Sequence, residues 1–188
     1  MNINITVTGA IFASGIAVSA WAHGGATGIV KERMDGMSTM GKAVKSLVPM
    51  MQGKIPLNPA QIRAAAQAIG QHSGDTLIKK FPKGSGKHPS KAKPAIWQDP
   101  QGFSALAKRL QTLAKGLEQA AGNPLMGQSG GNSMMGSSTS MMGGGTGMMG
   151  GSSANMPDLD QLAQMPVDGV YNMIAKTCSA CHSRFRAE

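Results

Sequence analysis

Apolar residues recur at helical spacing in four separate segments, and this periodicity restricts the fold more than any other feature of the chain. The segment that begins at Asp99 carries the strongest stripe, with an apolar residue at nearly every third or fourth position. Its members are Phe103, Leu106, Ala107, Leu110, Leu113, Ala114 and Leu117. Aromatic residues make up only 4% of the chain, too few for a β-sandwich or barrel. The sequence therefore predicts an all-α fold, a four-helix bundle.

Proline, glycine and capping residues set the expected ends of these helices. The expected bounds are residues 27–48, 58–81, 99–122 and a fourth helix from 168 onward. The second and third helices each begin with a capping residue and a proline, Asn58-Pro59 and Asp99-Pro100. Pro49 is expected to end the first helix, and Gly122 to follow the last turn of the third. The apolar face of the first helix is expected to contain Val30, Met34, Met37, Gly41, Val44 and Val48.

The first 22 residues carry no charged side chain and contain a short apolar stretch at residues 11–18. They end in Ala20-Trp21-Ala22, the small-residue pattern that precedes a signal-peptidase cut. An uncleaved membrane anchor is the alternative, but the apolar stretch is shorter than the ~20 residues that span a bilayer. Residues 1–22 are therefore predicted to be a signal peptide. The mature chain, residues 23–188, is expected in the periplasm.

The chain is basic, with Lys+Arg 18 against Asp+Glu 9. Six lysines fall within fifteen residues that contain no acid: Lys79, Lys80, Lys83, Lys87, Lys91 and Lys93. This cluster is either a solvated loop or a docking surface for an acidic redox partner. Nucleic acid is not expected as a partner, because no aromatic residues are interleaved with the basic ones.

Residues 125–156, between the third and fourth helices, contain no Lys, Arg, Asp or Glu. Three methionine pairs recur every seven residues in this segment: Met134-Met135, Met141-Met142 and Met148-Met149. The high glycine content opposes a stable helix, so the segment is predicted to be a flexible Met/Gly-rich loop. Thioethers also suit Cu(I), which makes copper binding at this loop a second hypothesis.

The sequence C-x-x-C-H occurs once, near the end of the chain, as Cys178, Cys181 and His182. This is the pattern of c-type haem attachment. Each thiol adds to one haem vinyl group, and the following histidine binds the iron. A thioredoxin-like redox pair, half of a zinc site and a plain disulfide are the alternatives. No βαβ context surrounds the pair, and the chain has no further cysteine that could complete a zinc site. Haem attachment is favoured over a plain disulfide because the only two cysteines of a secreted, all-helical chain lie in this motif.

Three stretches carry a resemblance to a known family: residues 176–186, Phe81-Pro82-Lys83-Gly84 and residues 95–103. They resemble the cytochrome c′ family, which also places its haem motif at the end of the chain. The resemblance covers residues 29–48, 59–121 and 168–186 and does not extend to the Met/Gly-rich insertion. It implies an antiparallel arrangement of the helices, one covalent haem c and often a homodimer.

The resemblance also implies what lies on the other face of the iron. The family's first helix has an arginine near the haem propionates, and the residue four positions later points at the distal face. These positions match Arg33 and Met37 in this sequence. Methionine there is typical of the low-spin, six-coordinate branch, because a thioether binds iron and stabilises Fe(II). Met37 is therefore expected to bind iron opposite His182.

Other interpretations of these residues stay open. A methionine at helical spacing is commonly core packing, and Met34 and Met40 lie one turn from Met37 on either side. Arg33 is equally compatible with a surface position.

The combined prediction is a periplasmic monohaem c-type cytochrome that carries single electrons between protein partners and transforms no substrate. One alternative is a five-coordinate cytochrome c′ that binds nitric oxide or carbon monoxide. The other is copper handling by the Met-rich loop.

Overall fold

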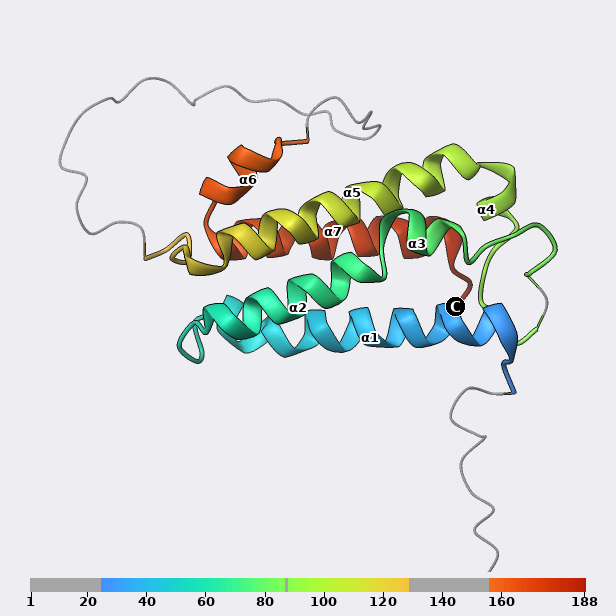
Figure 1. Ribbon diagram of the computed structural model, residues 1–188, viewed down its shortest axis with the longest axis horizontal. Coiled ribbons are helices and arrows are strands. Elements are labelled where there is room, and N and C mark those ends of the chain that lie inside the picture. Colours follow the sequence, from blue (N-terminus) through green and yellow to red (C-terminus); the bar gives the residue numbers. More distant parts are fainter. Residues whose placement is uncertain (1–24, 87, 129–155) are drawn as a thin grey trace, which may run out of the picture.

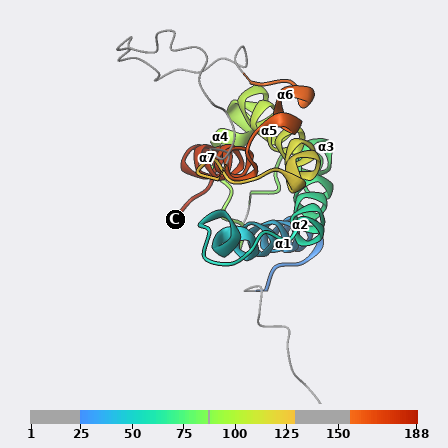
Figure 2. The same cartoon turned by 90° about the vertical axis from the view of Figure 1, so that its left-hand side faces the viewer.

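The computed structural model describes residues 25–86, 88–128 and 156–188, whose regular elements are helical apart from one isolated β-bridge. The frame consists of four long helices: α1 (Gly28–Met51), α2 (Pro59–Gln71), α5 (Pro100–Gln119) and α7 (Val167–Phe185). Figures 1 and 2 show α1 beside α2 and α5 beside α7, with consecutive long helices running in opposite directions. The prediction of an all-α, antiparallel four-helix bundle is confirmed.

Short helices complete the described part of the chain: α3 (Gly74–Ile78), α4 (Ala95–Gln98), the 3₁₀ helix η1 (Ala120–Gly122) and α6 (Leu159–Gln164). The predicted signal peptide and residues 129–155 of the predicted Met/Gly-rich loop lie outside the described residues. Within the described ranges, no helix has both the length and the apolar character that crossing a membrane requires.

The predicted starts of α2 and α5 are confirmed by their capping geometry. The Asn58 side chain accepts a hydrogen bond from the Gln61 backbone amide at 3.1 Å. The Asp99 side chain accepts one from the Gly102 amide at 3.0 Å, and a proline follows each cap. These caps satisfy amides that have no partner within the helix, so the sequence fixes both starting points.

Two predicted helix boundaries are wrong. α1 continues through Pro49 to Met51, because Leu47 and Met50 are fully buried and hold its last turn against the core. The predicted second helix breaks into α2 and α3 at Gly74, whose φ is 59°. This left-handed backbone conformation favours glycine, and a Cβ at residue 74 would also displace the end of the Gln111 side chain of α5.

The buried face of α1 also differs from the expected one. Its buried residues are Arg33, Gly36, Met40, Leu47 and Met50. The predicted face, which includes Met37, Val44 and Val48, is rotated away and only partly buried. Met37, Val44 and Val48 pack against the edge of the core and also line the cavities described below.

The short helix α6 packs on α5 at a glycine. Leu162 of α6 is fully buried, and a Cβ added at Gly116 would lie 2.7 Å from the Leu162 Cβ. The Asn123 side chain donates hydrogen bonds to the carbonyls of Ala163 and Met165 at 2.8 and 2.7 Å. These contacts fasten the chain after the insertion to the end of α5.

A Gly116→Ala variant tests this close packing. Alanine favours helix, yet its methyl group has to displace α6, so the free energy of unfolding is expected to fall by about 1–3 kcal/mol. Urea unfolding measures the change. The control is Gly122→Ala, where an added Cβ meets no atom within 4 Å. Equal stability of the two variants would contradict the packing described.

Candidate functional site

Two cavities lie along α1 and α7, the pair of long helices that contact each other least around the bundle. The first cavity, of about 440 Å³, is lined by residues from the start of α1, the loop before α4 and the end of α7. The second cavity, of about 320 Å³, is almost entirely apolar and extends along the middle of α1. Met37, Cys181 and His182 line both cavities, so the two form one site around these residues.

The three residues of the C-x-x-C-H motif lie on the last two turns of α7. Cys178 and Cys181 are partly buried against the cavities, and no disulfide joins them. Burial raises the pKa of the Cys178 thiol. Burial and the neighbouring Cys178 raise the pKa of Cys181 to about 11. Both sulfurs are therefore held as neutral thiols that face the site.

His182 follows on the same helix and lies at the exposed rim of both cavities. Partial desolvation and the positive charge of Arg186 lower its pKa. Both effects favour the neutral imidazole, which is the form that binds a metal ion through the lone pair of its unprotonated nitrogen.

The alternatives for the motif find no support in the described part of the chain. None of its residues form a group of three or more His, Cys, Asp or Glu side chains that would hold a metal ion. Within residues 25–86, 88–128 and 156–188, no strand lies beside the cysteines, as a thioredoxin-like pair would require. The copper hypothesis concerns residues 129–155, which lie outside the described residues, and no comparison with known proteins supports it.

Met37 projects from α1 into the same space as the motif. Among the three methionines of this part of α1, Met34 lines only the first cavity and Met40 only the second. Met40 is also 6% exposed and belongs to the core. Only Met37 lines both cavities together with Cys181 and His182, which separates it from its two neighbours.

Arg33 lies in the wall of the first cavity and is only 4% exposed. Its guanidinium donates hydrogen bonds to the carbonyls of Lys80 and Ser85 and to the hydroxyls of Ser85 and Ser90. Burial lowers its pKa. The surface position that the sequence analysis left open for Arg33 is therefore wrong. It fastens the loop of residues 80–90 to α1, and a haem propionate would have to share these donors.

A row of three aromatic rings lines the same cavity, and the sequence analysis did not identify it as a unit. Phe81 and Phe103 meet edge to face with ring centroids 4.9 Å apart, and Phe103 and Phe185 do so at 5.5 Å. Arg33 lies over the Phe81 ring at 4.6 Å, and Arg184 lies 5.3 Å from the Phe185 ring. The row joins the start of α1 to the end of α7 through apolar and cation–π contacts.

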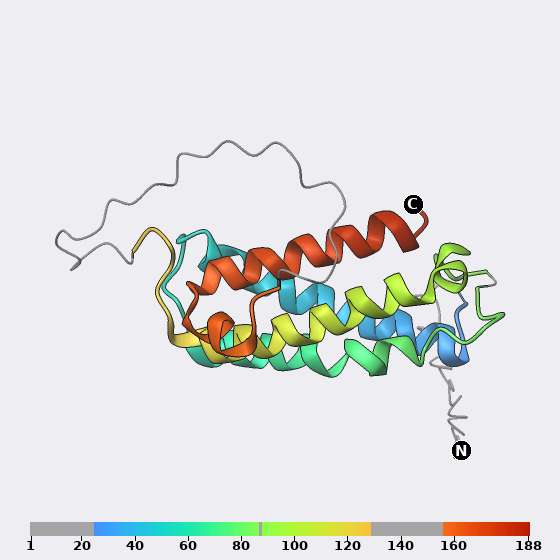
Figure 3. The same ribbon diagram turned by 90° about the horizontal axis from the view of Figure 1, so that it is seen from above.

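The end of α7 is tied to the loop before α4 by backbone pairing. The Lys93 amide donates to the Phe185 carbonyl at 2.9 Å, and the Ala187 amide donates to the Lys91 carbonyl at 2.8 Å. Arg184 pairs with Asp99 at 2.7 Å. Figures 1 and 3 show the C-terminus at the end of the bundle where α1 begins. These contacts also hold Arg186, a cavity residue that the sequence analysis missed, beside His182.

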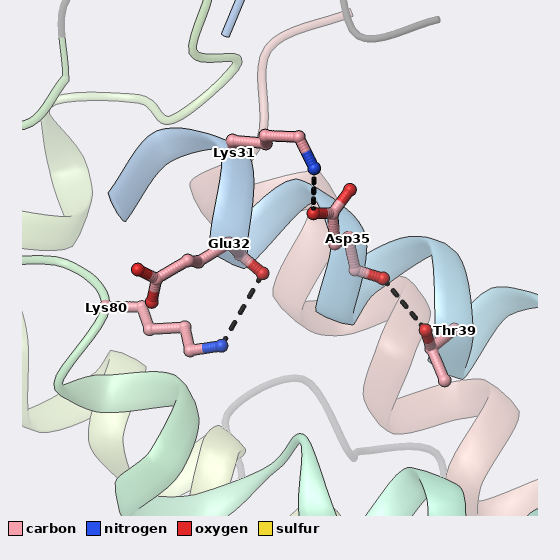
Figure 4. Close-up of polar contacts among 5 residues, drawn as sticks. All are labelled: Lys31, Glu32, Asp35, Thr39 and Lys80. Carbon is pink, nitrogen blue, oxygen red and sulfur yellow. Dashed lines mark hydrogen bonds and ion pairs between the residues drawn. The ribbon is translucent and has the colours of Figure 1, made fainter. Parts of the chain in front are cut away.

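The lysine cluster is only partly available to a partner. The side-chain amines of Lys80, Lys91 and Lys93 donate to the backbone carbonyls of Glu32, Glu188 and Ser183. Figure 4 shows the first of these contacts, next to the Lys31–Asp35 ion pair of 2.6 Å on the outer side of α1. Lys79 and Lys83 are exposed, and Lys87 lies outside the described residues.

The fold and the site together define a c-type haem protein built on a four-helix bundle. The sequence profile described as Cytochrome C′ matches residues 28–140, which excludes the C-x-x-C-H motif. The chain is 33% identical over 87 residues to a cytochrome c-556 of Agrobacterium tumefaciens (strain B2A), covering 46% of this chain and 70% of the relative. This chain belongs to the cytochrome c′ family and is a haem c-type cytochrome.

Solved structures share the fold at lower sequence identity. Cytochrome c′ from Rhodopseudomonas palustris matches with a TM-score of 0.58 at 20% identity, covering 87% of this chain and 98% of that one. Cytochrome c′ from Thermochromatium tepidum matches with a TM-score of 0.57 at 19% identity, covering 85% and 95%. Both matches include the bundle that carries the site.

The residues around the cavities fit a covalent haem c. Two thiols one turn apart face a largely apolar space, and an imidazole lies at its rim. Cys178 and Cys181 would hold the haem through thioethers, and His182 would bind its iron. The apolar walls suit the macrocycle, and Arg33, Lys91 and Arg186 supply positive charge in the first cavity.

An Arg33→Met variant tests the role of this residue as a fastener of the loop. The variant leaves several partly buried acceptors without a donor, so the free energy of unfolding is expected to fall by about 1–3 kcal/mol. Arg33→Lys is not expected to restore the wild-type stability, because an ammonium group lacks the planar, forked arrangement of N–H donors of a guanidinium. Urea unfolding and protease cleavage within residues 80–90 measure the effect. Arg63→Met, at an exposed site on α2, is the control, and equal losses in the two methionine variants would contradict this role.

Proposed function

We propose that this protein is a periplasmic, monohaem electron carrier whose iron is bound by His182 and Met37. It accepts and donates single electrons and transforms no substrate. Arrival in the periplasm depends on the signal peptide proposed at residues 1–22, and haem attachment on Cys178 and Cys181.

The observation that carries the proposal is the position of Met37. It is the methionine of α1 that lines both cavities, as Cys181 and His182 do from α7. α1 and α7 thus present a thioether and an imidazole to one shared space. Such a pair fills both axial positions of a haem iron and leaves none for an external ligand.

The bound group supplies an iron that alternates between Fe(III) and Fe(II). Met37 offers a soft, neutral ligand that favours Fe(II) and raises the reduction potential. The neutral form of His182 is favoured by desolvation and by Arg186. The second cavity has an almost entirely apolar lining, which would surround part of the haem, and burial of the haem is a further means of setting the potential.

The partners proposed are redox proteins with acidic surfaces. The chain has a net charge of +9. Lys79 and Lys83 are exposed, the first next to and the second within the loop of residues 80–90 that lines part of the first cavity. Opposite charge on a partner would speed the encounter and make its rate depend on salt. The homodimer and the absence of a nucleic-acid partner stay predictions.

Gas binding is the second candidate function, and iron coordination separates it from electron transfer. Among the structural matches is a nitric oxide complex of a cytochrome c′ variant from Alcaligenes xylosoxidans, 21% identical to this chain. A five-coordinate iron would show a high-spin spectrum that carbon monoxide shifts. A six-coordinate iron would show a low-spin spectrum that carbon monoxide leaves unchanged.

A Met37→Leu variant is the direct test, because leucine keeps the volume and removes the sulfur. The wild-type haem protein is expected to be low-spin, and the variant high-spin and able to bind carbon monoxide. Its reduction potential is expected to fall, because the ligand that favours Fe(II) is lost. Met34→Leu and Met40→Leu are the matched controls and are expected to stay low-spin. A Met37→Leu protein with the wild-type spectrum would overturn the proposed ligation.

A further inference from the structure

Gly41 lies in the interior of α1, where glycine destabilises a helix relative to alanine. The other glycines in the interior of the described helices each have a close neighbour at the position of a missing Cβ. These pairs are Gly36 with His72, Gly70 with Ala114, Gly102 with Asp99, Gly116 with Leu162, and Gly169 with Met165. Gly36, Gly102 and Gly116 have neighbours closer than an ordinary van der Waals contact, at 3.2 Å for Gly36 and 2.7 Å for Gly116, and Gly70 and Gly169 are in ordinary contact, at 3.7 and 3.4 Å.

Gly41 has no such neighbour. A Cβ added there meets no atom of the described chain within 4 Å, and its φ is not in the left-handed region. Neither close packing nor backbone conformation requires glycine at this position. The residue lines the second cavity together with Met37 of the same helix, and Cys178 of α7 lines that cavity as well.

The spacing links Gly41 to Met37. Residues four apart lie one turn along the same helix face, about 6 Å apart along the axis. A porphyrin is wider than one helical turn, so a ring bound through Met37 also passes the position one turn on. A side chain at that position would push the ring away from α1 and draw the iron away from the Met37 sulfur.

We propose that Gly41 supplies the clearance that lets the haem lie against α1 closely enough for Met37 to bind its iron. This inference rests on the proposed ligation by Met37 and adds a residue that determines coordination without being a ligand. On this interpretation, the glycine lowers the stability of α1 but leaves space for the haem against the helix. Replacing it should favour the helix and oppose the iron–sulfur bond.

The experiment compares Gly41→Ala and Gly41→Leu in the full chain with haem attached. Gly41→Leu is expected to become high-spin, to bind carbon monoxide and to show a lower reduction potential. Gly41→Ala, with a single methyl group, is expected to keep more of the low-spin form. Mass spectrometry and far-UV circular dichroism check that haem attachment and helix content are unchanged.

Two further variants separate clearance from a general effect of added bulk. Lys42→Leu places the same side chain on the exposed side of α1 and is expected to keep the wild-type spectrum. In a Met37→Leu background, Gly41→Leu is expected to cause no further change in spin state or potential, because the bond it opposes is already absent. An additional shift in that background would mean that Gly41 acts by another route, and would overturn the inference.

The outcomes also distinguish this inference from the proposed function. A low-spin wild type with a Gly41→Leu variant that is equally low-spin, at the same potential, overturns the role of Gly41 and leaves Met37 as the ligand. A high-spin wild type that binds carbon monoxide overturns both.

Discussion

The site depends on the way α2 and α5 hold α1 and α7 apart. α2 packs along α5, and each of these helices also packs on one of the outer pair. α1 and α7 touch each other much less, and the two cavities lie along them. The thiols and the imidazole come from α7 and the thioether from α1. The separation of these two helices therefore decides whether one group can contact both.

The wall of the first cavity shows how this separation is kept at the open end of the bundle. Arg33 joins α1 to the loop of residues 80–90 through its hydrogen bonds and through the Phe81 ring. The aromatic row continues through Phe103 to Phe185, and the backbone pairing of residues 91–93 with 185–187 closes the end of α7. α1 and α7 pack little against each other, so these polar and aromatic contacts fix the position of His182 relative to α1.

Much of this arrangement could be predicted from local sequence signals. Asn58 and Asp99 marked helix starts because a cap and a proline act on the nearest backbone amides. The break at Gly74 could not be found this way, because a glycine in an apolar-periodic segment does not by itself show that its φ is positive. The buried face of α1 was misplaced because five of the six residues predicted for it line the cavities, where they are not fully buried. The resemblance placed Arg33 near the site. Its hydrogen bonds to residues 80–90 could not be predicted, because that loop has no hydrophobic periodicity from which its conformation could be inferred.

The central claim is that a sulfur from α1 and a nitrogen from α7 occupy the two axial positions of one iron. X-ray absorption at the iron edge of the mature wild-type protein tests it most directly, in the ferric and the ferrous states. The account predicts one sulfur neighbour in addition to the pyrrole and imidazole nitrogens in both states. A first coordination shell of nitrogens alone would contradict it.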